Sequence, residues 1–268
     1  MSITHTSNPE KLQKHSEFQY HIRMYRDEDR QQVHELYENA LFWESHSPLR
    51  PFLKAVAKES PISRALYLTS AVGVLLWPSY PRLGPTIFLT AAAIGLLQAG
   101  LIFQFILKAT RKNLHGDLAD IRKHYELVPS AEASSYDHGN LISSGPKAFW
   151  VVVATQKVTG RTELVGCGGM DIVQDEGKVD AEFQRMAVSG RHLRQGVAAM
   201  VVQAAAAHAR SHKLSSVQLM TSMVQKPAIQ LYKKHGWVEE RRQDINIFGM
   251  IAQSVHMRLH LTENVLLS

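Results

Sequence analysis

Several short segments of the chain have the hydrophobic pattern of β-strands. Residues 20–25 and 254–261 alternate apolar and polar side chains, as expected for a strand with one buried face. Residues 149–154, 164–170 and 216–220 are short, mostly apolar or β-compatible runs. Helical patterns separate several of them, so we predict a mixed α/β domain whose first strand joins strands from the second half of the chain.

A strand, a basic turn and a helix follow one another in the second half of the chain. Residues 181–188 suit a strand, 189–195 are polar and cationic, and 197–209 are alanine-rich and apolar without Pro or Gly. Such a turn directs backbone N–H groups and the positive end of a helix toward one point, which favours phosphate. Gly196 has no Cβ to obstruct that approach. The alternative is an ordinary strand-to-helix turn with a basic surface.

A second helix has clear boundaries in the sequence. Pro227 suits the first turn of a helix, and Gly236 suits the position just after its end. Between them, Ala228, Leu231 and Tyr232 fall at i, i+3 and i+4 and therefore share one helical face. The pattern predicts a short helix with a buried face.

A hydrophobic insertion interrupts the domain. Residues 85–107 carry no charge, and this run of roughly 23 residues can cross a hydrocarbon core. Residues 65–77 are also uncharged but short for a full span, and the Pro- and Gly-rich residues 78–85 predict a turn between the two runs. We predict a hairpin or re-entrant loop in a lipid bilayer; the alternative is a pair of buried helices in a soluble domain.

Both ends of this insertion must lie on one side of the membrane, because one sheet cannot form across a bilayer. The flanks are basic, which favours the cytoplasmic side. The flanking cations are Lys54, Lys58, Arg64, Lys108, Arg111 and Lys112.

The patterns divide the chain into four parts. We expect a mobile polar tail at 1–17, the first strand and helix at 18–50, the membrane hairpin at 51–112 and the rest of the domain at 113–262. Within the last part, residues 127–147 are rich in Ser, Pro, Gly and Asp and predict a long loop.

The two motifs together resemble those of the GNAT superfamily of N-acetyltransferases. Residues 193–198, Leu-Arg-Gln-Gly-Val-Ala, resemble its acetyl-CoA-binding motif Arg/Gln-x-x-Gly-x-Gly/Ala, with Leu193 departing at the first position. Residues 225–237 resemble Asn-x-x-Ala-x-x-Leu-Tyr-x-x-x-Gly-Phe, with Gln225 and Trp237 in place of Asn and Phe. The resemblance implies a GNAT acyl-CoA acyltransferase fold, an α/β (α+β) mixed sheet, here with an inserted hydrophobic helical hairpin.

The domain order is similar to the camello-like, membrane-bound branch of that superfamily, which includes cysteine S-conjugate N-acetyltransferases. The resemblance extends over residues 20 to 261. It implies an endoplasmic-reticulum membrane location and an amine substrate, and the basic flanks place the catalytic domain on the cytosolic side. That amine is either a small one, such as a cysteine S-conjugate, or a protein lysine or N-terminus.

The resemblance also implies roles for particular residues. Glu182 corresponds to a general base and Tyr232 to the acid that protonates the leaving thiolate; otherwise they are a solvated strand residue and a core aromatic residue. Acetyl-CoA is the implied co-substrate. The residues implied to bind it are Met186, Val188, Leu193, Arg194, Gln195, Gly196, Val197, Ala198 and Gln225.

Composition adds few constraints. The net charge of +6 suits an anionic membrane surface or an anionic ligand, and no nucleic-acid motif is present. His208 and His212 are spaced like a metal pair but have no evident third ligand, so we expect no metal. Cys167, the one cysteine, lies between glycines and suits a small buried thiol. Homo-oligomerisation stays open, as does the alternative of a non-catalytic GNAT-fold membrane protein that binds a partner.

Overall fold

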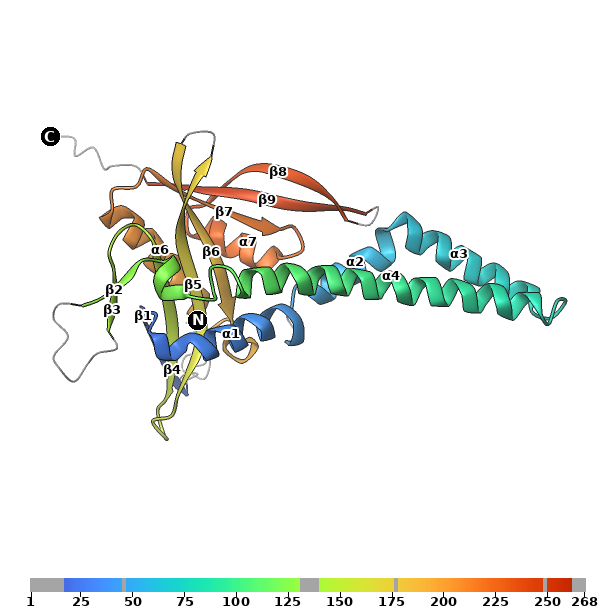
Figure 1. The fold of residues 1–268 in the computed structure, drawn as a ribbon, viewed down its shortest axis with the longest axis horizontal. Coiled ribbons are helices and arrows are strands. Elements are labelled where there is room, and N and C mark those ends of the chain that lie inside the picture. Colours follow the sequence, from blue (N-terminus) through green and yellow to red (C-terminus); the bar gives the residue numbers. More distant parts are fainter. Residues whose placement is uncertain (1–16, 45–46, 131–139, 176–177, 248–249, 262–268) are drawn as a thin grey trace, which may run out of the picture.

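The computed structural model describes residues 17–44, 47–130, 140–175, 178–247 and 250–261 (Figure 1). Its centre is a seven-stranded sheet in the order β1-β4-β5-β6-β7-β9-β8, in which only the β6–β7 pair is parallel. This mixed α/β architecture confirms the predicted fold class.

The strands of the sheet are β1 (Phe18–Met24), β4 (Ala148–Gln156), β5 (Thr162–Asp175), β6 (Lys178–Val188), β7 (Ser216–Ser222), β8 (Val238–Ile247) and β9 (Met250–His260); β2 (Leu127–Pro129) and β3 (Leu141–Ser143) form a separate pair. The α-helices are α1 (Arg30–Glu38), α2 (Leu49–Glu59), α3 (Pro61–Leu76), α4 (Leu83–Leu114), α5 (Ile121–His124), α6 (Val197–Ser211) and α7 (Lys226–Lys234). Short 3-10 turns lie at η2 (Asp27–Asp29) and η4 (Gly190–His192), and a π-helical turn, η3 (Asn39–Trp43), continues α1.

Each face of the sheet has its own hydrophobic core. On one face, α6 and α7 bury residues such as Val201 and Tyr232 against the strands. On the other face, α1 and the segment around α5 bury Val33, Leu118 and Tyr125. Burial of this apolar surface on both sides holds the central strands between two layers of helices.

The parallel pairing of β6 with β7 is short. It joins Ala181 to Val217 and Glu182 to Gln218, and no further pair follows among the described residues. Immediately beyond, β6 bulges: its register with β5 shifts, and Arg185 has a positive φ of 58°. The part of β6 after Glu182 therefore has backbone groups on its β7 side that the sheet leaves unpaired.

The hydrophobic insertion forms a helical hairpin that extends away from the sheet (Figure 1). α3 and α4 pack closely where glycines meet backbone: a Cβ on Gly73 would lie 2.7 Å from the Phe88 nitrogen, and a Cβ on Gly84 2.6 Å from the Trp77 Cα. α4, with 32 residues, is long and apolar enough to cross a bilayer, whereas α3 is shorter. Many large apolar side chains of this hairpin are exposed, including Leu68, Leu75, Leu89, Leu96, Leu97 and Leu101.

Some local expectations differ from the structure. The predicted loop at 127–147 contains the β2–β3 pair, because Leu127 and Leu141 are buried in the second core. Residues 131–139 of that loop lie outside the described part, as does nearly all of the predicted tail at 1–17. Helix α2 and strand β8 were not anticipated from hydrophobic periodicity.

Candidate functional site

The basic turn after β6 leads into α6. The first backbone N–H groups of α6 have no hydrogen-bond acceptor within the helix. Gly196 has a φ of 85° and precedes the first helical residue, and no side chain caps the helix. The Met200 N–H donates to the Gly196 carbonyl at 3.0 Å and so begins the hydrogen bonding of the helix. The three preceding N–H groups of α6 have no intrahelical acceptor, as at any helix start. A Cβ at Gly196 would meet nothing within 4 Å, so this backbone faces open space.

The side chains of the motif divide between surface and core. Arg194 and Gln195 are exposed, while Leu193 and Ala198 are half-buried. Val197 is fully buried, and a Cβ on Gly166 of β5 would lie 2.5 Å from its Cγ1 atom. The absence of a side chain at Gly166 therefore lets the start of α6 sit close to the sheet.

His192 fastens this turn to two strands. Its ring is 3% exposed, Nε2 lies 2.8 Å from Glu163 Oε1, and Nδ1 lies 2.9 Å from the Tyr20 hydroxyl. We did not anticipate this contact, because its partners lie far away in the chain. The position of a histidine in the basic turn was the only available signal.

Glu182 lies at the last paired position between β6 and β7 and opposite Asp171 on β5. It is half-buried, and its side chain makes no hydrogen bond or salt bridge to the other residues that the structure describes. Burial raises the pKa of its carboxyl group; the nearby Arg185 lowers that pKa, and Asp171 raises it. A carboxylate with a raised pKa suits proton abstraction near neutral pH.

Tyr232 lies on the other face of β6, among core aromatic side chains. Its hydroxyl points to the Met186 sulfur at 3.9 Å, and its ring packs edge-to-face on Phe183. Burial raises the pKa of this hydroxyl above its usual value, so it stays protonated at neutral pH. The bulge at Arg185 turns Met186 toward Tyr232, and the two candidate catalytic side chains thus flank the unpaired stretch of β6.

Two further residues predicted to bind acetyl-CoA, Val188 and Gln225, lie at the same edge of the sheet. Val188 ends β6 opposite Gly166. Gln225 precedes α7 just after β7, and its side-chain oxygen accepts a hydrogen bond from the Thr221 hydroxyl at 2.9 Å. Because β6 and β7 are parallel, their carboxyl ends meet at one edge, which is where open α/β sheets bind ligands.

An apolar groove that we did not predict lies beside the end of β7. Its volume is about 190 Å³, and it lies between β7 and the base of the hydrophobic hairpin. The lining residues are Leu41, Pro48, Leu49, Phe52, Phe105, Ile106, Thr110, Ser222 and Val224.

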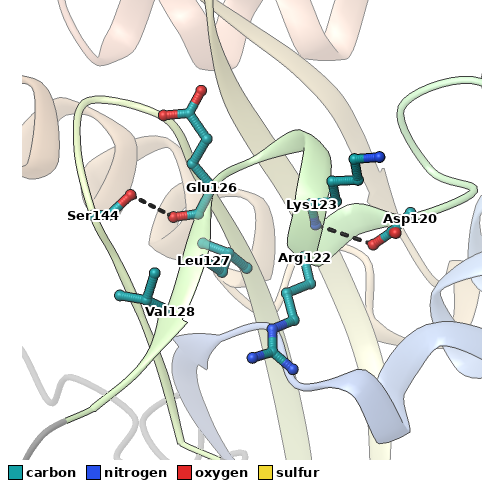
Figure 2. A pocket seen from close by; sticks show the side chains of 7 residues that line it. All are labelled: Asp120, Arg122, Lys123, Glu126, Leu127, Val128 and Ser144. Carbon is teal, nitrogen blue, oxygen red and sulfur yellow. Dashed lines mark hydrogen bonds between the residues drawn. The ribbon is translucent and has the colours of Figure 1, made fainter.

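Two open polar clefts lie beside α5. Their volumes are about 320 and 370 Å³, and they share Asp120, Lys123 and Glu126. Figure 2 shows the first cleft, where the Asp120 carboxylate accepts from the Lys123 N–H and Ser144 donates to the Glu126 carbonyl. None of the residues predicted to bind acetyl-CoA lines either cleft.

No metal-binding cluster of three or more His, Cys, Asp or Glu side chains occurs within the described part of the chain. His208 and His212 stack with ring centroids 4.3 Å apart. Cys167 is fully buried, as expected, and burial raises the pKa of its thiol to about 12.

Comparisons with known proteins find similar acetyltransferase sequences. The Acetyltransferase (GNAT) family model matches residues 117–237. N-acetyltransferase family 8 member 2 of Rattus norvegicus is 27% identical over 231 residues, which cover 81% of this chain and 84% of the relative. N-acetyltransferase 8B of Homo sapiens is 26% identical over 251 residues, covering 90% and 95%.

Among solved structures, a GNAT-family acetyltransferase from Staphylococcus aureus Mu50 is 10% identical with a TM-score of 0.48, covering 91% of this chain and all of that chain. The match to the family model coincides with the strands, turn and helices that form the candidate site. Residues 117–237 therefore match the GNAT acetyltransferase family, and the chain is similar over most of its length to proteins of the N-acetyltransferase 8 group.

Proposed function

We propose that this protein is a membrane-anchored N-acetyltransferase that moves the acetyl group of acetyl-CoA to a small amine bearing an apolar substituent. The observation that carries the proposal is the unpaired stretch of β6 after Glu182, which ends at the uncapped start of α6. That edge offers backbone hydrogen bonds to an extended ligand and a positive helix end to its phosphates.

The residues present fit acetyl-CoA. The unbonded N–H groups at the start of α6 and the open space over Gly196 suit the pyrophosphate. Main-chain groups of Met186 and Val188 suit the amides of the pantetheine arm. Since these contacts come from backbone, Leu193 at the first motif position does not remove them, and nothing in the described residues favours a non-catalytic binding module.

Transfer to an amine needs a base and an acid. Glu182 takes a proton from the substrate ammonium group, which frees the nitrogen lone pair to attack the thioester carbonyl. The carbon–sulfur bond then breaks, Tyr232 donates its proton to the departing thiolate, and the tyrosine regains a proton from the new amide nitrogen. The sum is one amide, one free thiol and one proton released.

The apolar groove bears on the identity of the amine. It lies at the carboxyl end of β7, beside the proposed acetyl-CoA edge, and is walled by Phe52 and Phe105. Burial of a hydrophobic substituent in this groove is favourable, whereas burial of the charged and polar groups around a protein lysine is not. The groove therefore favours a small amine of the cysteine S-conjugate kind over a protein lysine or N-terminus.

The exposed hydrophobic hairpin supports membrane anchoring. Leu75 and Leu96 are 77% and 76% exposed, and several neighbours on α3 and α4 are more than half exposed. Such a continuous apolar surface is unfavourable in water and favourable in lipid. With basic residues on both flanks, we propose an endoplasmic-reticulum hairpin whose catalytic domain faces the cytosol.

An acetylation assay tests this proposal. The full-length protein in lipid nanodiscs is incubated with acetyl-CoA and either S-benzyl-cysteine or a lysine-containing peptide, and thiol release is followed. We expect turnover with S-benzyl-cysteine and little with the peptide. Phe105→Ser should raise the KM for S-benzyl-cysteine, while Leu97→Ser, on the outer surface of α4, should not. No acetylation of either amine would contradict the proposed activity, and preference for the peptide would contradict the proposed substrate class.

A further inference from the structure

A series of polar side-chain contacts starts beside Glu182 and leads away from the apolar groove. Asp171 lies directly opposite Glu182 on the neighbouring antiparallel strand, so both side chains share one face. The Asp171 carboxylate is 2.8 Å from His124 Nε2 through one oxygen and 3.4 Å from Lys147 Nζ through the other. Gln184 Nε2 approaches the same carboxylate at 3.5 Å.

Lys147 and Arg185 are cations beside these contacts, and both already pair with carboxylates. Lys147 also pairs with Glu126 at 3.1 Å, so one cation bridges two carboxylates. Arg185 near Glu182 is already held by the buried Asp117 at 2.7 Å. Glu182 therefore faces a carboxylate across the strands, and its own nearest cation is engaged elsewhere.

His124 connects these buried groups to water. The Asp171 side chain is 14% exposed, whereas that of His124 is 36% exposed. His124 and Lys147 line the open polar cleft of about 370 Å³ beside α5. The neighbouring cleft, which shares Asp120, Lys123 and Glu126 with it, is drawn in Figure 2.

We propose that Asp171 and His124 relay the substrate proton from Glu182 to solvent in the cleft beside α5. The inference rests on the proposed acetyl transfer with Glu182 as base. The Glu182 proton passes through one bridging water to the Asp171 carboxylate and from there to Nε2 of His124, which accepts it; the ring then releases its Nδ1 proton to water in the cleft, and exchange with that water returns the ring to its starting tautomer. Each cycle carries one proton outward and leaves all three side chains in their starting state. Asp171 and His124 are thus positioning residues that act through Glu182.

The proton needs a separate route to solvent because the groove proposed for the substrate is apolar. Once an amine occupies the groove lined by Phe52 and Phe105, few polar groups remain there to accept a proton. The α5 side offers a hydrogen-bonded route with a water-accessible end instead.

Three variants test the relay with S-benzyl-cysteine as the acceptor probe. His124→Ala should lower kcat about tenfold, since the relay supplies part of the usual contribution of acid–base catalysis. Added imidazole, a diffusible proton carrier, should restore most of that loss. Asp171→Asn should also lower kcat, and it should shift the acid limb of the kcat/KM profile to lower pH, because removing its negative charge lowers the pKa of Glu182. Lys123→Ala, in the same cleft but outside this series of contacts, should leave all of these unchanged.

The outcomes distinguish failure of the relay from failure of the proposed acetyltransferase activity. If the wild-type protein does not acetylate S-benzyl-cysteine, the proposed function is wrong and the relay that depends on it is wrong with it. If the wild type is active and His124→Ala matches it, or loses activity that imidazole does not restore while its melting temperature is unchanged, the relay is wrong. An unmoved acid limb in a folded Asp171→Asn protein would overturn the coupling to Glu182.

Discussion

The backbone conformation at Gly196 is more important for the turn before α6 than any side chain around it. Its φ of 85° is costly for a residue with a Cβ, especially a β-branched one. Arg194, two residues earlier, is exposed and contributes only a solvated charge to the same surface. We therefore propose that the backbone, rather than these side chains, forms the anion site.

We expect Gly196→Val to weaken acetyl-CoA binding by at least about tenfold, because the substitution strains the turn and obstructs the N–H groups. Arg194→Ala should cost only a few-fold, since it keeps those groups in place. Isothermal titration of both variants measures the difference. A larger loss for Arg194→Ala would refute the backbone site.

The buried Asp117 makes Arg185 important for stability. Asp117 is 9% exposed and accepts from Arg185 at 2.7 Å and from the Tyr125 hydroxyl at 3.0 Å. We expect Arg185→Gln to lower the free energy of unfolding by about 2 kcal/mol, because it leaves a buried carboxylate without its cation. Arg122→Gln, which breaks an exposed pair with Asp27, should change it by less than about 0.5 kcal/mol. Chemical denaturation distinguishes them, and equal effects would contradict this account.

At the scale of elements, the helices and strands that depend on local sequence patterns were predicted, whereas the long-range contacts were not. The strand and helix around Gly196 and the helix ending at Gly236 depend on turns and periodicity within a few residues, and both are present in the structure. The contact between His192 and Tyr20 spans 172 positions and that between His124 and Asp171 spans 47, so no local pattern contains them. Such pairs arise only when the sheet brings distant strands together.

The apolar groove was missed for the same reason. Its walls come from η3, α2, α4 and the end of β7, and each segment alone resembles ordinary core or membrane sequence. The hydrophobic pattern did predict the hairpin helices themselves. It did not predict that their base would approach the end of β7.

The packing of α3 on α4 depends on small residues at particular positions. A side chain at Gly73 would collide with the Phe88 backbone, whereas one at Gly100 would meet nothing within 4 Å. We expect Gly73→Leu to separate the two helices and to lower the melting temperature in detergent, while Gly100→Leu should be tolerated. A disulfide between cysteines introduced on α3 and α4 should form less readily in Gly73→Leu. Equal behaviour of the two variants would contradict the close helix contact.

For the molecule as a whole, the central fact is that one sheet contains strands from both sides of the hydrophobic hairpin. β1 precedes the hairpin, and its partner β4 follows it. The chain must therefore return to its starting side of any membrane that the hairpin enters.

We expect glycosylation acceptor sites introduced at Ser7 and at Ser134, which both lie outside the described residues, to stay unmodified in microsomes. A domain facing the lumen would carry sugar at both positions. Modification at only one position would contradict the same-side topology.

The most direct test of the central claim is the effect of acetyl-CoA on the thermal stability of the purified, folded protein. A ligand of the native state stabilises it by mass action, by about 2.7 kcal/mol at one hundred times its Kd. We predict a clear, concentration-dependent rise in melting temperature for the wild type and a much smaller rise for Gly196→Val. No shift at millimolar acetyl-CoA in a folded wild-type sample would contradict acetyl-CoA-dependent catalysis by this protein.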